Sequence, residues 1–318
     1  MSISQNFQNT YPNLNLNFAL EKTLDPRVSF SRASTATYVG SNGLIQTAGV
    51  NTPRFTYDPV TGKSLGLLVE ESRSNLQTYS QKISNYNTGG TTTITDNVTI
   101  APDGTNTASL AIPTTGTYTH IATNYFNLGS GSFTFSVFAK AAGYPRIGMR
   151  VYDGTVYQIR ATFDIQNGVI IDNTAGRAII IPYPNGWYRC ICSGTSASGN
   201  MGSVAGWDID IQNSTTLVQQ AYAGDGVSGV YLWGEQIETG LFPTSYIPTS
   251  GSTVTRSADI TQITSTNFSN IYNSNGGGLS VVATPASQTQ NRTNVVTIGS
   301  GNTNYAASIT LLPGANGA

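Results

Sequence analysis

Charged side chains are scarce in this sequence. They make up 10% of its 318 residues, against roughly 25% in an ordinary soluble domain. The 15 basic residues nearly balance the 16 acidic ones, giving a net charge of −1, and Lys and Arg occur singly rather than in runs. Such a chain exerts no long-range attraction on a polyanion. We therefore expect no nucleic-acid groove.

Histidine and cysteine are almost missing. Because His120 is the single histidine, His-rich zinc centres and every H-E-x-x-H arrangement are excluded, and we expect no metal centre and no cofactor. Cys190 and Cys192 lie two residues apart in a strand-like run, so both side chains face one way and the geometry disfavours a bond between them. Free thiols suit folding in a reducing cytoplasm.

Long apolar runs are also missing. No stretch approaches the roughly 18 apolar residues of a membrane-spanning helix, and residues 1–6 lack the charged and apolar regions of a signal peptide. The sequence therefore predicts a soluble, non-exported chain without membrane insertion.

What the sequence does contain is turn and strand formers. It has 34 Gly, 17 Tyr and 11 Phe, with many Ser, Thr and Asn, a composition that suits short strands and tight turns around a buried core. Hairpins are predicted at residues 37–46 and 54–69, because Asn-Gly and Asp-Pro pairs supply their turns. Longer strands are expected at residues 118–128, 132–140, 146–152, 156–163, 177–182, 186–195, 204–211 and 227–238.

The fold class that follows is all-β, an antiparallel jelly-roll sandwich, since apolar positions recur every two residues and no long segment shows helical periodicity. A helical turn is expected at residues 264–273 and a strand at 279–284. We expect four parts: an extended arm at 1–24, a β-hairpin attachment segment at 25–75, a carbohydrate-binding-like jelly roll at 76–260 and an incomplete second β module at 261–318.

The arm carries the predicted attachment residues. Leu14, Leu16 and Phe18 are spaced by two and alternate with polar residues, so in a strand they would face one side and add to a partner's sheet edge. The segment has too little apolar surface to fold alone. The alternative is that these residues complete the protein's own first sheet.

Catalytic motifs are sparse. Residues 62–66 spell G-x-S-x-G, but a turn leading into a strand is the wrong setting for a nucleophile elbow. Asp208 and Asp210 share one strand face, and Glu235 and Glu238 end another, so a glycosidase-like carboxylate pair or a calcium site stays open. The favoured interpretation is an outward polar face, and we expect no catalytic residue and no enzyme.

Aromatic side chains are the candidate binding groups, because sugars stack their C–H faces on such rings. Large aromatics in a sandwich more often lie in the core. Tyr222 is expected to be the most exposed, since its neighbours have the composition of a rim loop. The candidates for carbohydrate binding are Tyr222, Trp187 and Trp207, with Tyr188 and Trp233 nearby.

Several segments resemble those of phage fibre and virion structural proteins. Residues 28–38 (VSFSRASTATY) and 66–76 (GLLVEESRSNL) look like the opening segment of that family. Its jelly roll, similar to carbohydrate-binding modules, is matched by further segments. These are 101–105 (APDGT), 133–140 (FTFSVFAK), 186–190 (GWYRC), 231–238 (YLWGEQIE), 243–249 (PTSYIPT) and 254–259 (VTRSAD).

This resemblance implies a virion component assembled in the host cytoplasm, usually an oligomeric appendage and often a homotrimer, whose N-terminal arm binds other virion proteins. It also implies a following concanavalin A-like module, which residues 268–273 and 277–281 resemble. The leading hypothesis is a fibre or fibre-like appendage, most often a tail fibre, that contributes to adhesion to host-surface glycans. A capsid decoration or head fibre protein and a receptor-binding glycan depolymerase are the alternatives.

Overall fold

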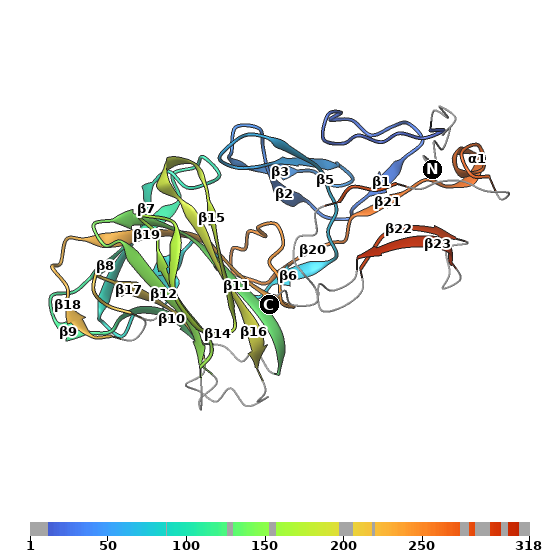
Figure 1. The fold of residues 1–318 in the computed structure, drawn as a ribbon. Coiled ribbons are helices and arrows are strands. Elements are labelled where there is room, and N and C mark those ends of the chain that lie inside the picture. Colours follow the sequence, from blue (N-terminus) through green and yellow to red (C-terminus); the bar gives the residue numbers. More distant parts are fainter. Residues whose placement is uncertain are drawn as a thin grey trace, which may run out of the picture.

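The computed structural model describes residues 12–86, 88–125, 130–152, 157–196, 206–217, 220–273, 280–283, 293–299 and 305–311. These residues are mostly strands and turns (Figure 1). All the strand pairs that build their sheets are antiparallel, which confirms the predicted all-β fold. The described residues contain no helix long and apolar enough to cross a membrane.

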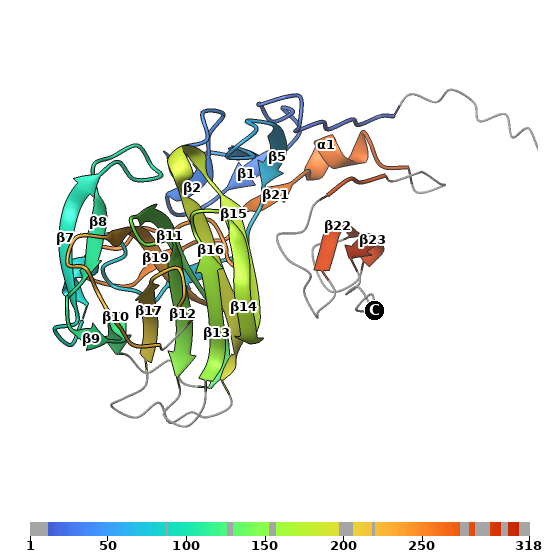
Figure 2. The ribbon, with the colours of Figure 1, turned by 60° about the vertical axis from the view of Figure 1, so that its left-hand side comes forward.

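The main body is a sandwich of two antiparallel sheets (Figure 2). The five-stranded sheet has the order β10 (His120–Tyr125), β17 (Gly206–Gln212), β12 (Arg146–Tyr152), β13 (Tyr157–Asp164) and β14 (Val169–Ala175). The six-stranded sheet has the order β15 (Arg177–Pro182), β16 (Tyr188–Ser196), β11 (Gly131–Ala142), β19 (Gly229–Thr239), β8 (Ala108–Pro113) and β7 (Thr92–Thr99).

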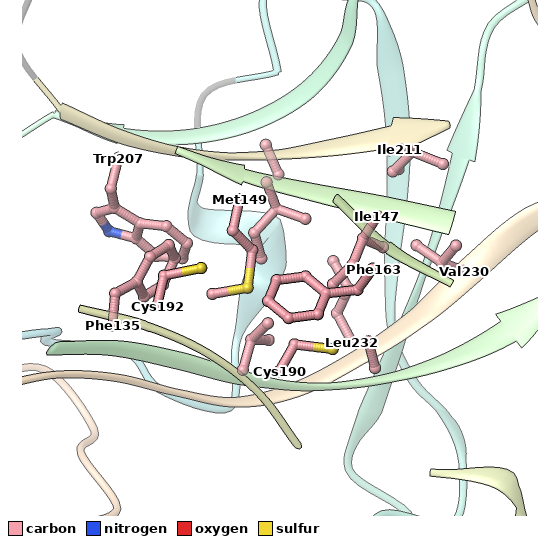
Figure 3. Close-up of a cluster of buried hydrophobic side chains, with 14 of the residues drawn as sticks. Phe135, Ile147, Met149, Phe163, Cys190, Cys192, Trp207, Ile211, Val230 and Leu232 are labelled. Atoms are coloured by element: carbon pink, nitrogen blue, oxygen red, sulfur yellow. The ribbon is translucent and has the colours of Figure 1, made fainter. Parts of the chain in front are cut away.

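The core lies between these sheets, where alternate side chains of each strand meet (Figure 3). Trp207 of β17 packs on Phe135 of β11, Ile209 of β17 and Met149 of β12 belong to the same cluster, and all four are at most 1% exposed. Burying one such side chain contributes about 1.5–3 kcal/mol. The period of two that predicted strands therefore also selected the correct inward faces.

The two cysteines belong to this core. Cys190 and Cys192 form no disulfide and are fully buried on the inner face of β16. Burial raises the pKa of both thiols, well above the usual value for Cys190. The native protein should therefore take up no label from a thiol reagent at pH 8, whereas the denaturant-unfolded chain should take up two. Rapid labelling of the native protein, measured by mass spectrometry, would contradict this packing.

The N-terminal part consists of two predicted hairpins, both confirmed. Strand β2 (Ala36–Val39) pairs with β3 (Ile45–Ala48), and β4 (Arg54–Tyr57) pairs with β5 (Ser64–Leu68). In the second turn the Asp58 carboxylate accepts hydrogen bonds from the backbone N–H groups of Val60 and Thr61. Gly62 closes that turn at a φ of +65°, which glycine adopts without steric cost.

The chain returns to this N-terminal part after leaving the sandwich. Strand β6 (Arg73–Asn75) pairs with β20 (Val254–Arg256), and β1 (Ser29–Ser31) pairs with β21 (Ile260–Gln262). The remaining elements are β9 (Thr117–Tyr118) paired with β18 (Tyr222–Ala223), β22 (Thr293–Gly299) paired with β23 (Tyr305–Leu311), the 3-10 turns η1 (Ile83–Asn85) and η2 (Pro184–Gly186), and helix α1 (Ser265–Ser269). Residues 240–262, which follow β19 and which we name the return segment, thus pair with strands that lie more than 170 residues earlier in the sequence.

Several elements differ from the sequence-based expectation. Strands β7, β8 and β14 were not predicted, and the strand expected at 118–128 is divided into β9 and β10. Residues 280–283 of the strand expected at 279–284 are not in a strand, and the two end positions lie outside the described residues. Strand β7 escaped prediction because it is mostly polar and half exposed, so it has little apolar alternation.

Candidate functional site: a charged junction and a polar sheet face

Five charged side chains meet where the return segment crosses the N-terminal hairpins. They lie at the ends of short strands or within two residues of them, and all except Arg54 belong to a motif quoted above. Their side chains are at most 8% exposed. We name this group the charged junction, and its members are Arg32, Arg54, Glu70, Arg256 and Asp259.

Asp259 binds the two hairpins together. Its carboxylate accepts a hydrogen bond from Arg32 at 2.9 Å through one oxygen, while the other oxygen accepts from Arg54 and from the Glu70 backbone N–H at 2.9 Å. Both Asp259 and its two arginine partners have fully buried side chains. A buried carboxylate of this kind is stable only while its partners remain in place.

Glu70 makes the second set of contacts in the charged junction. It lies 2.8 Å from the Arg54 guanidinium and accepts hydrogen bonds from the backbone N–H and hydroxyl of Ser245, each at 2.7 Å. Arg256 lies 3.6 Å away, and burial lowers its pKa. The charged junction therefore holds the first hairpins, the return segment and the end of β20 as one unit.

Asn75 links this unit to the sandwich. Its amide N–H donates to the carbonyls of Glu235 and Ile247 at 3.0 and 2.8 Å, and its amide oxygen accepts from the N–H groups of Ile237 and Gln77 at 3.1 and 3.0 Å. Asn75 is fully buried. One side chain thus ties β6, β19 and the return segment together.

The outward face of β17 is polar, as expected, but it is not exposed. Asp208 and Asp210 point away from the core, yet they are only 8% and 1% exposed. The Arg150 Nε atom lies 2.5 Å from the Asp208 carboxylate and 3.9 Å from that of Asp210. Among the described residues no group of three or more metal-ligating side chains occurs.

The other two carboxylates considered for catalysis lie inside the protein. Glu235 and Glu238 are fully buried on β19. Burial raises the pKa of Glu235 well above its usual value, although hydrogen bonds from Tyr86 and Gln77 act in the opposite direction. Burial also raises the pKa of Glu238, whose carboxylate accepts hydrogen bonds from the N–H and hydroxyl of Thr244.

The three candidate sugar-binding rings lie in the interior. Trp207 packs on Phe135, Trp187 donates its indole N–H to the Ile100 carbonyl at 3.2 Å, and Tyr222 donates its hydroxyl to the Ile211 carbonyl at 3.0 Å. Their exposures are 0%, 2% and 8% in the same order. The expectation that Tyr222 is exposed is therefore wrong. Residue 222 follows a short loop, but pairing of β18 with β9 turns its ring inward.

The described half of the arm contacts the same chain. Leu14, Leu16 and Phe18 are each half-buried and alternate with exposed residues, as expected for one-sided packing. The Phe18 ring lies 6.3 Å from that of Phe55 in β4. Phe18 thus packs on the protein's own hairpin, but none of the three residues lies in a strand, so they do not complete a sheet of this chain. Residues 1–11 lie outside the described residues.

Sequence reasoning missed the charged junction. The available signal was that few residues in the chain are charged, while the opening and return motifs contain Arg32, Glu70, Arg256 and Asp259. No protein-family model matches the chain, and no curated protein matches its sequence.

Proposed function

We propose that this protein is a structural component of a bacteriophage particle. It is a fibre or fibre-like appendage, and a tail fibre is the favoured form. The observation that carries the proposal is the charged junction. Segments 28–38, 66–76, 243–249 and 254–259, which resemble phage fibre motifs, are far apart in sequence and meet there. A rigid connection between an attachment segment and a sandwich is what an appendage needs to hold its outer part in position.

Adhesion to host-surface glycans is a secondary part of the proposal. We assign glycan binding to the rim loops of the sandwich, because loops commonly carry binding residues. The rings of Trp187, Trp207 and Tyr222 do not contribute, since they lie in the interior. A glycan array probed with the purified chain tests this part. Failure to bind any host polysaccharide would remove adhesion and leave the structural role standing.

A capsid decoration or head fibre protein would use the same rigid connection and differ only in location. A glycan depolymerase receives no support from the four carboxylates considered, because Asp208 and Asp210 lie beside Arg150 and both glutamates are buried. Release of reducing sugar from host capsule by the purified protein would overturn this preference.

The deciding experiment locates the chain on the particle. Antibodies against the purified protein, applied to intact particles in electron microscopy, should label one kind of projection, and mass spectrometry of purified particles should detect the chain. Labelling of the head instead of the tail would select the decoration or head fibre alternative. Absence of the chain from purified particles would overturn the proposal.

We further propose that the chain is a homotrimer. Oligomeric appendages place several copies of a weak binding surface side by side, which raises the effective affinity for a repetitive host surface. Light scattering of the full chain should give three times the mass of 33.6 kDa. A monomeric mass across micromolar concentrations would count against this part.

The contacts of Phe18 separate two roles of the arm. Deleting residues 2–11 should leave the melting temperature of the isolated protein unchanged while reducing incorporation into particles. By contrast, Phe18→Ala should loosen the β4–β5 hairpin, because Phe18 packs on Phe55, at a cost of about 1–3 kcal/mol for a half-buried ring. Melting and quantitative incorporation assays distinguish the two. Wild-type incorporation after deletion would exclude residues 2–11 as the anchor.

A further inference from the structure

The single histidine lies at an edge of the sandwich. His120 begins β10, an edge strand of the five-stranded sheet, and its side chain is completely buried. Strand β10 lies next to β7, an edge strand of the six-stranded sheet, and both lie near the short β9–β18 pair (Figure 2). The imidazole is thus placed where three peripheral segments meet, a region we name the histidine rim.

Both ring nitrogens of His120 face backbone carbonyl oxygens. Nδ1 lies 2.5 Å from the Thr91 oxygen, and Nε2 lies 2.9 Å from the Tyr222 oxygen. A carbonyl oxygen only accepts hydrogen bonds. The Thr91 oxygen already accepts from the backbone N–H and the hydroxyl of Thr114, at 3.0 and 3.1 Å. Each ring nitrogen therefore has to act as a donor.

A neutral imidazole cannot meet this requirement. It carries one N–H, so one of the two contacts would set a nitrogen lone pair against an oxygen lone pair. In the imidazolium form both nitrogens donate, and hydrogen bonds from a charged donor are the stronger kind. These four atoms can therefore form two hydrogen bonds only when the ring is doubly protonated.

Two tyrosine rings pack against the imidazole. The ring centroids of Tyr118 and Tyr222 lie 6.2 and 4.7 Å from that of His120 in edge-type contacts, and Tyr144 contacts Tyr222 at 5.6 Å. These contacts hold the imidazole against β9 and β18.

The other titratable groups named here near the histidine rim do not change their charge state at pH values near neutral. Burial raises the pKa of Tyr222 and Tyr144, so both phenols stay neutral. Hydrogen bonding to Ser228 lowers the pKa of Asp225, so this carboxylate stays ionised. Its negative charge also raises the pKa of both tyrosines. The Asp210 carboxylate, on the far face of β17, also raises the pKa of Tyr222. Imidazole is the side chain whose charge ordinarily changes between about pH 5 and 8.

We propose that His120 is a proton-operated latch of the histidine rim. As an imidazolium it connects β10 to Thr91, the residue before β7, and to Tyr222 of β18. When the ring loses a proton, one of the two carbonyl contacts is lost and the histidine rim loosens. The protein would then present stiffer rim loops in mildly acidic surroundings than in alkaline ones.

Because the chain has one histidine, its imidazole can be observed without assignment by long-range proton–nitrogen NMR on the full-length protein. We expect both ring nitrogens to be protonated wherever the histidine rim is closed. The amides of Thr114 and Gly224, which bond the Thr91 and Thr114 carbonyls, report on closure. Their hydrogen-exchange protection factors should fall about tenfold as the ring loses its proton, the equivalent of one hydrogen bond.

The control variant is His120→Gln, which removes every imidazole titration from the chain. Its rim protection should be independent of pH between 5 and 8, whereas protection of core amides such as those of β11 should be unchanged in both proteins. A single neutral tautomer together with a fully protected rim would overturn the proposal. So would protection that stays constant while the ring titrates, or a ring that keeps both protons up to pH 9. The wild-type titration decides the question even if the variant does not fold.

Discussion

Replacement of Asp259 by asparagine should destabilise the protein by about 3–5 kcal/mol, because it leaves two fully buried guanidinium groups without their shared carboxylate. The variant amide also places N–H groups against arginine donors, which cannot accept them. We expect a large fall in melting temperature and rapid proteolysis between the N-terminal hairpins and the sandwich. Thermal melting and limited proteolysis measure both effects.

Two further variants make this prediction specific. Asp25→Asn removes a surface pair with Arg27 at 2.7 Å and should leave melting nearly unchanged, since exposed pairs contribute little. Adding Arg32→Met to Asp259→Asn removes the buried cation that has lost its carboxylate partner, so the double variant should be more stable than the sum of the two single losses predicts. Simple additivity, or a mild Asp259→Asn variant, would contradict the charged junction as described.

Local chemistry explains which parts of the fold were predictable. The Asn42-Gly43 turn needs a positive φ, +77° at Gly43, and the sequence shows this need directly. Strands β12 and β15 were predicted with their observed bounds, because apolar alternation and flanking turns define them. Elements that apolar alternation and flanking turn residues define were therefore predicted correctly.

Features that depend on distant partners could not be predicted in this way. Arg54 and Asp259 look like surface residues in sequence, and only the return of the chain after 205 residues buries one against the other. Asp208 lies on the outward face as alternation predicts, but Arg150 on the neighbouring strand covers it. Tyr222 lies beside a loop, yet its short pairing with Tyr118 turns the ring inward. Burial in all these cases, and the orientation of the Tyr222 ring, depended on tertiary contacts.

Burial of Glu235 should make the free energy of unfolding of the protein fall as the pH rises. In the unfolded chain its carboxyl ionises near the ordinary value of 4.5, whereas burial raises the folded pKa well above that value. Between these two pH values the folded state binds more protons than the unfolded state, so stability falls as pH rises. The fall approaches about 1.4 kcal/mol per pH unit for one proton. The uncompensated buried oxygen Oε1 of Glu235 supports the same direction.

Glu235→Gln keeps the shape of the side chain and cannot ionise. We therefore expect the variant and the wild type to differ little near pH 5, and the variant to become progressively more stable than the wild type toward pH 8. Asp25→Asn is the control, because the pKa of Asp25 is lowered to about 2 by its hydrogen bonds with Arg27. That carboxylate is ionised in both states from pH 5 to 8, so its curve should run parallel to that of the wild type. Denaturant unfolding at each pH measures the three curves, and a Glu235→Gln curve that is also parallel would show that the buried carboxyl does not carry a proton in the folded protein.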